Sequence, residues 1–100
     1  MESVWPAAQD VEQQVLLDVD TRYRKLVEAR SLIDSQAAVQ EVEREKLRVL
    51  TNRYQEKATL LTDVLQQQSA LAQADSQYQQ AIAAFWVARA DFDRALGEEY

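Results

Sequence analysis

The scarcity of helix-breaking residues constrains this chain more than any other feature of its sequence. Its 100 residues include a single proline, Pro6, and a single glycine, Gly97, which lie close to opposite ends. Tight turns between β-strands need glycine, proline or asparagine at fixed positions, and phosphate-binding loops need several glycines close together. The long stretch between Pro6 and Gly97 has neither pattern. We therefore predict an all-α fold with very few turns.

The composition excludes several classes of function. Hydrophobic residues make up 47% of the chain and charged residues 28%, which is typical of folded rather than disordered sequences. Without cysteine or histidine the chain lacks disulfides, thiolate or imidazole metal ligands, and the usual nucleophile pairs. We expect no catalytic residue, no cofactor and no metal, and the chain is not predicted to be an enzyme. The net charge of −6 also argues against nucleic acid as a partner.

Apolar residues in the second half repeat at heptad spacing along one helical face. Large side chains alternate with alanines three residues later, and this predicted packing seam consists of Leu71, Ala74, Tyr78, Ala81, Phe85, Ala88, Phe92 and Ala95. A 3.5-residue period indicates a left-handed coiled coil, in which alanines allow a neighbouring helix to come close. We predict a helix over about 60–96 that Gly97 ends as a C′ glycine.

The first half has a less regular apolar stripe and predicts a helix over about 6–55. The stripe consists of Leu16, Val19, Tyr23, Leu26, Ile33, Ala37, Leu47 and Tyr54, and it is interrupted by Arg30, Gln40 and Arg44. Ion pairs at i,i+4 spacing support this helix, and we expect them between Asp18 and Arg22 and between Asp20 and Arg24. Glu41 and Glu45 share a helical face, and we interpret them as solubilising charge because helical-bundle metal sites also need histidine.

A break between the two patterns predicts a turn at about 56–60. Neither glycine nor proline forces it, and Thr59 or Thr62 can serve as an N-cap. One continuous helix, roughly 135 Å long at 1.5 Å per residue, is the alternative. We favour a long antiparallel two-helix coiled-coil hairpin, which places Tyr23 beside Phe92 and Arg30 over the ring of Phe85 in a cation–π contact. Because such a hairpin buries little surface, we expect it to self-associate into a larger helical bundle.

The residues around this turn resemble the TolC-like outer-membrane efflux proteins. The family's tip has an Arg-Tyr pair, a turn and then Asp-Val-Leu, which this chain matches with Arg53-Tyr54 and Asp63-Val64-Leu65. One departure is Lys57, which stands where the family usually has glycine. Further matches lie along both helices, at Val19, Tyr23, Leu26, the run 69–74, Tyr78, Ala81 and the Ala95-Leu96-Gly97 ending.

The resemblance implies that this chain is a segment of a periplasmic α-helical tunnel, in the periplasmic part of an outer-membrane protein. Three protomers form such a channel, and its tips dock a periplasmic adaptor protein of a tripartite efflux or secretion pump. The tip that faces the adaptor would consist of Lys57, Ala58, Thr59 and Leu60. Asp63 would line the pore constriction, with Gln66 in place of the family's second acidic residue. No direct membrane contact is expected of this segment.

Three other interpretations remain open at this point. Asp63 can be an ordinary carboxylate in the first turn of a helix, where the helix dipole favours it. The whole chain can be a general coiled-coil oligomerisation or scaffold module, which would use the same seam without a tip function. It can also be the coiled-coil hairpin of the adaptor protein itself, although Asp63-Val64-Leu65 and Ala95-Leu96-Gly97 are more similar to the channel.

Overall fold

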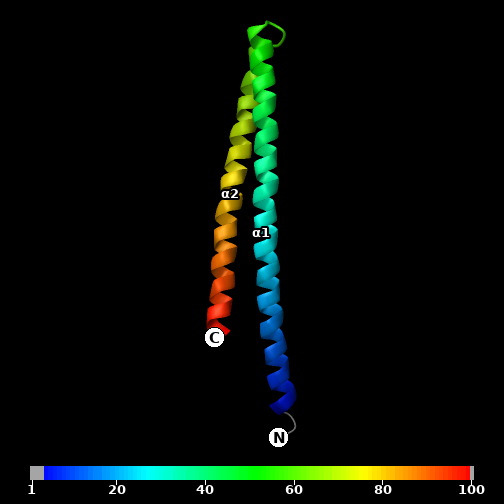
Figure 1. The fold of residues 1–100 in the computed structure, drawn as a ribbon, viewed down its shortest axis with the longest axis vertical. Coiled ribbons are helices and arrows are strands. Elements are labelled where there is room, and N and C mark those ends of the chain that lie inside the picture. The colour runs from blue at the N-terminus through cyan, green and yellow to red at the C-terminus, as the bar shows by residue number, and fades with distance from the viewer. Residues whose placement is uncertain (1–3, 100) are drawn as a thin grey trace.

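The chain folds into one antiparallel pair of long helices (Figure 1). The computed structural model describes the backbone of residues 4–99 and the side chains of residues 10–97. Helix α1 spans Val4–Gln55 and helix α2 spans Leu61–Glu99, and the hairpin measures 84 × 19 × 15 Å. The prediction of an all-α two-helix hairpin is confirmed, and this structure does not contain the continuous helix.

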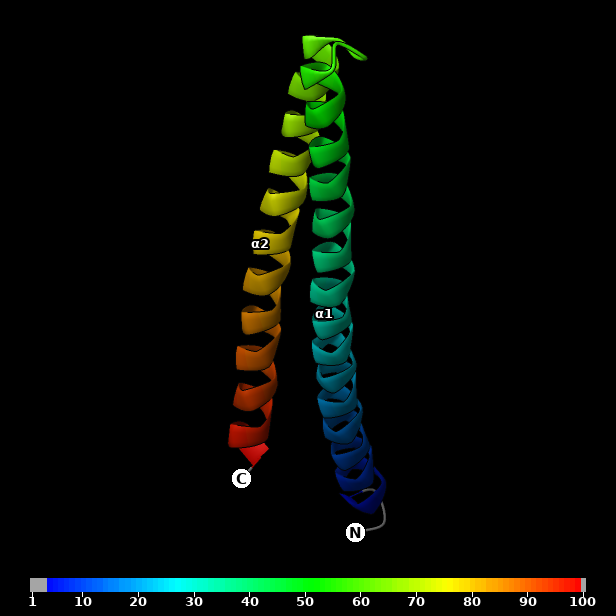
Figure 2. The same ribbon diagram turned by 45° about the horizontal axis from the view of Figure 1, so that its top comes forward.

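The two helices touch along their length but are not parallel cylinders. They lie closest beside the turn and separate toward the open end, as Figures 1 and 2 show from two directions. In both views α1 extends well beyond the C-terminal end of α2. The first part of α1 therefore has no neighbouring helix within the described residues.

Helix α2 turns its alternating large and small residues toward α1. The buried side chains are Val64, Ala74, Ala81 and Ala95, with between 2% and 5% of their surface exposed. The large residues between them are half-buried: Leu71, Tyr78, Phe85 and Phe92, together with Ala88. Because alanine has no side chain beyond Cβ, a neighbouring helix can pack closely over it, which explains the low exposure of Ala74, Ala81 and Ala95.

The inner face of α1 differs from the predicted stripe. Leu16 and Tyr54 are 66% and 42% exposed, so their predicted place in the stripe is wrong. Tyr23 is 52% exposed, although its ring contacts Phe92 of α2. Most half-buried positions alternate spacings of three and four residues, at Val19, Arg22, Leu26, Ala29, Ile33, Gln36, Gln40, Glu43, Leu47 and Leu50, and three further half-buried positions are Ala37, Val49 and Thr51. Several inner positions are polar. A stripe defined by apolar residues alone therefore leaves these positions out and includes exposed residues such as Leu16 in their place.

The predicted pairing across the hairpin holds for one aromatic pair and fails for another contact. The rings of Tyr23 and Phe92 lie 5.7 Å apart at an interplanar angle of 50°, which confirms the predicted pair. Arg30 is exposed and pairs with Asp34 on its own helix, which leaves the predicted cation–π contact with Phe85 unmade. Within the described side chains, Arg89 makes such a contact instead, 5.4 Å above the ring of Trp86.

Gly97 does not end α2. The helix continues through it to Glu99, and Gly97 does not have a positive φ. A glycine ends a helix when it takes the left-handed conformation at C′, and with helical dihedrals it is only a weak helix former. The prediction of a C′ glycine at this position was therefore wrong.

Candidate functional site

The turn between the helices is a Schellman motif centred on Lys57. The amide of Ala58 donates to the carbonyl of Arg53 at 2.7 Å, and the amide of Lys57 donates to the carbonyl of Tyr54 at 3.0 Å. These two bonds satisfy carbonyls that the end of α1 would otherwise leave without a partner. The motif needs its C′ residue in the left-handed region, and Lys57 has φ 60°. Glycine is the usual residue there, and a non-glycine residue costs roughly 1–2 kcal/mol.

The four predicted tip residues lie together at the closed end of the hairpin. Lys57 and Ala58 are exposed, Thr59 is half-buried, and 69% of the Leu60 surface is exposed. Leu61 and Leu65 follow on α2 and are 48% and 51% exposed. The closed end therefore combines a flexible cation with several exposed leucines.

Asp63 lies in the first turn of α2, close to the tip. Its carboxylate accepts a hydrogen bond of 2.7 Å from the hydroxyl of Thr59, and its amide donates to the carbonyl of Leu60 at 3.1 Å. A carboxylate at this place is also stabilised by the helix dipole. Gln66, one turn later, is exposed. The structure thus brings Asp63 together with Thr59, and both the pore interpretation and the helix-start interpretation fit this geometry.

Polar side chains on the inner face of α1 form bonds to α2 that the sequence patterns did not predict. The Gln40 amide donates to the Asp75 carboxylate at 2.6 Å. The Gln67 amide donates to the carbonyl and the carboxylate of Glu43. Gln67 is half-buried at this contact. Val19, Leu26, Ile33 and Gln40 repeat every seven residues, and the residues three positions after each of them complete the inner face of α1. This spacing is the sequence signal that locates the face.

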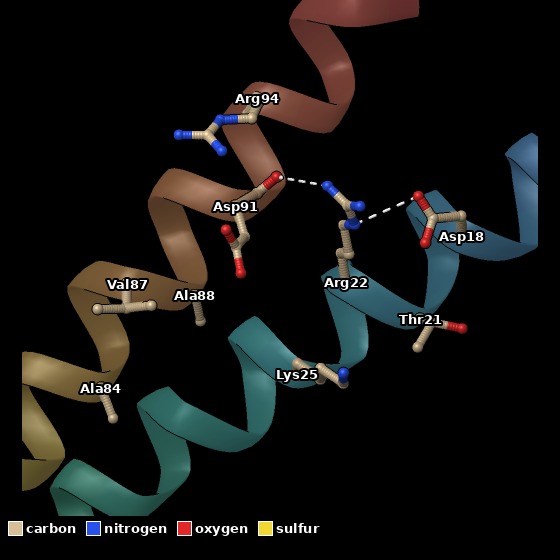
Figure 3. A pocket seen from close by; sticks show the side chains of 9 residues that line it. All are labelled: Asp18, Thr21, Arg22, Lys25, Ala84, Val87, Ala88, Asp91 and Arg94. Atoms are coloured by element: carbon tan, nitrogen blue, oxygen red, sulfur yellow. Dashed lines mark hydrogen bonds and ion pairs between the residues drawn. The ribbon is translucent and has the colours of Figure 1, made fainter.

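A groove of about 680 Å³ opens between the helices where they separate (Figure 3). Arg22 crosses it, with one guanidinium nitrogen donating to the carbonyl of Asp91 at 3.3 Å and another bonded to Asp18. Small and apolar side chains line the α2 wall beside charged residues. The lining consists of Asp18, Thr21, Arg22, Lys25, Ala84, Val87, Ala88, Asp91 and Arg94.

The carboxylates of α1 are used locally in ion pairs. Glu41 pairs with Arg44 and Glu45 with Arg48, so neither glutamate is free to join the other. The hydrogen bond from Arg48 holds the pKa of the Glu45 carboxyl below its ordinary value. Across the described residues no group of three or more acidic side chains is placed to hold a metal ion. Neither described helix has a stretch long and apolar enough to cross a membrane.

Comparison with known proteins identifies no relative for this chain. The sequence matches no family model, no curated protein and no solved structure. Function must therefore be inferred from the hairpin's own residues.

Proposed function

We propose that this chain is a non-enzymatic hairpin of the periplasmic tunnel of a TolC-like export channel, with a tip that docks an adaptor protein. The observation that carries the proposal is the conformation of Lys57. This residue stands where the family usually has glycine, and it takes the left-handed φ of 60° that glycine favours. The departure from the family's pattern in the turn itself therefore keeps the geometry that a glycine would give.

Asp63 and the tip have separate roles in this proposal. Lys57, Ala58, Thr59 and Leu60 face the adaptor, and Leu60 supplies exposed apolar surface for the contact. Asp63 lies about one turn inside the tip, and in a trimer three such carboxylates converge near the pore axis. Their combined negative potential attracts cations and is screened by salt over roughly 8–10 Å. With Gln66 in place of a second acid, this ring is weaker than one with two carboxylates per protomer.

A chimaeric channel tests the proposal. Residues 19–96 would replace the matching hairpin of an efflux channel whose adaptor is known, and the product would be reconstituted in a lipid bilayer. We expect a conducting trimer in which Asp63→Asn reduces cation block while helicity is unchanged. Substituting Ala58 or Thr59 should weaken adaptor coupling and leave conductance unchanged. If Asp63→Asn lowers only the melting temperature, Asp63 is a helix-start carboxylate and the pore assignment is wrong.

The exposed apolar side chains favour a second candidate, a general oligomerisation module. Leu16, Leu17 and Val87 are 66%, 65% and 64% exposed, although none of them lies at the tip. A module of this kind would self-associate along its flanks, and tip substitutions would change nothing. The chimaera separates the candidates because only the channel hairpin responds to changes at Ala58 and Thr59.

A further inference from the structure

The turn at 56–60 reverses the chain without a helix-breaking residue. It contains Glu56, Lys57, Ala58, Thr59 and Leu60, all of which a helix accepts. The reversal requires Lys57 to adopt an unfavourable φ of 60°. For a non-glycine residue this conformation lowers the equilibrium constant for forming the turn by about a factor of ten. A continuous helix through residues 56–60 would avoid this cost.

Most side-chain contacts across the hairpin are arranged almost symmetrically about Lys57, and the Glu43–Gln67 pair near the turn is the exception. Tyr23 contacts Phe92, Gln40 bonds to Asp75, and Arg22 bonds to Asp91. In each of these pairs the two residues lie almost equally far from Lys57 along the chain. Two straightened copies of the chain, laid antiparallel, would therefore form each of these three contacts twice, with a two-fold axis beside Lys57.

The inner face of α1 also continues through the turn. Leu47, Leu50, Tyr54, Lys57, Leu61 and Val64 alternate spacings of three and four residues. The spacing slips once at Gln67, and a long coiled coil absorbs such a stammer by local overwinding. Tyr54, Leu60 and Leu61 are 42%, 69% and 48% exposed in the hairpin. In the straightened pair Tyr54 of one copy is level with Leu60 and Leu61 of the other, which removes apolar surface from water.

We propose that this chain has a second, concentration-dependent form, an antiparallel domain-swapped dimer. In this dimer α1, residues 56–60 and α2 are one helix, and α1 of each copy pairs with α2 of the other. Short turns under strain favour such exchange, because the same contacts form without the strained residue. The dimer has no tip. It therefore removes Lys57 to Leu60 from any partner that binds the closed end, and the proposal does not depend on the identity of that partner.

Distances within one chain test the swap. Ser35 and Gln79 are exposed and level with each other across the hairpin, and the chain has no native cysteine. Both would be replaced by cysteine and spin-labelled, and the labelled chain would be folded at high concentration with a tenfold excess of unlabelled chain. In the isolated dimer we expect an intrachain distance of about 66 Å, from the rise of 1.5 Å per residue. A distance near 20 Å, or the absence of a dimer at every concentration, would overturn the proposal.

A glycine at the turn supplies the second test. Lys57→Gly favours the left-handed turn and weakens a continuous helix, and two copies are affected in each dimer. We expect the dimer dissociation constant to rise about a hundredfold. Ala83→Gly is the matched control, because Ala83 is exposed and helical in both forms, and it should leave that constant unchanged. An unchanged dissociation constant in Lys57→Gly would also overturn the proposal.

Discussion

The two helices of this hairpin are held in different ways. Every ion pair among the described side chains lies within α1, from Asp18–Arg22 to Glu45–Arg48. The described side chains with the least exposure, Val64, Ala74, Ala81 and Ala95 at 2–5%, all lie in α2. Exposed ion pairs contribute only a few tenths of a kcal/mol each, and buried apolar groups contribute more. The difference indicates that the buried residues of α2 contribute most of the packing free energy between the helices. The ion pairs of α1 stabilise only α1 itself.

The polar inner face of α1 gives the pairing its specificity. Gln40 and Glu43 bond to groups on α2, and each bond forms only in the observed register. An apolar face alone tolerates sliding by a heptad, whereas a polar group in the seam loses its partner when the helices slide. We infer that α2 sets the strength of the pairing and α1 sets its register.

Overpacking α2 should have the largest effect on stability. Ala81 is only 2% exposed, and Ala81→Leu forces α1 away from it. We expect the free energy of unfolding in urea to fall by about 1–3 kcal/mol. Gln80→Leu is the control, because Gln80 is the exposed neighbour of Ala81 and its change should have little effect. Equal losses from the two substitutions would contradict the adhesive role of the α2 seam.

Removing a bond from the inner face of α1 should have a smaller effect. Gln40→Ala leaves the half-buried Asp75 carboxylate without the Gln40 amide, and we expect a loss of about 1 kcal/mol. A double-mutant cycle with Asp75→Asn isolates the contribution of this bond. If the two substitutions are additive, Gln40 and Asp75 do not fix the register.

Breaking an exposed ion pair of α1 should cost still less. Arg24 bonds to Asp20 at 3.1 Å, and 75% of the Arg24 side chain is exposed. We expect Arg24→Ala to lower the free energy of unfolding by about 0.3 kcal/mol, and the difference should disappear in 1 M salt. A loss as large as that of Ala81→Leu would mean that α1 charges hold the hairpin together.

Acid should weaken one α1 pair in a defined direction. The hydrogen bond from Arg48 lowers the pKa of Glu45 in the folded chain. The pair therefore stabilises the folded chain at pH values above the pKa that Glu45 has when unfolded. This stabilisation is lost as the pH falls through the lower pKa that Glu45 has when folded. Wild type and Glu45→Gln should differ in stability at neutral pH and converge in acid. An NMR titration of the Glu45 carboxyl should show a higher midpoint in Arg48→Ala, and an unchanged midpoint would rule out the pair.

The sequence predicts α2 better than α1 for a physical reason. In α2 the large residues and the alanines both follow the heptad, so one pattern locates the whole face from Leu71 to Ala95. In α1 the inner positions Arg22, Gln36 and Glu43 are polar, while apolar Tyr23, which is 52% exposed, and half-buried Ala37 lie one position away from Arg22 and Gln36. Hydrophobic periodicity therefore selects these apolar residues and misses the polar inner positions beside them. The bonds of Gln40 and Gln67 depend on the register between the helices, which no local pattern contains.

The conformation of the tip was also beyond local sequence rules. A Schellman motif is expected where glycine follows a helix, and here Lys57 takes the left-handed position. The packing of two long helices supplies the free energy that offsets this local cost. Tertiary structure thus decides the conformation of the turn, whereas its position at about 56–60 follows from the break between the two apolar patterns.

A distance between Thr21 and Arg94 tests most directly whether the seam of α2 closes the hairpin on α1. Both side chains are exposed and line the groove in Figure 3, so spin labels there leave the seam intact. The measurement uses cysteine variants at a concentration where the chain sediments as a monomer. The account predicts a separation of about 20 Å, from helices in contact plus the label arms. A separation of about 110 Å, the length of one straight helix between these residues, would contradict it.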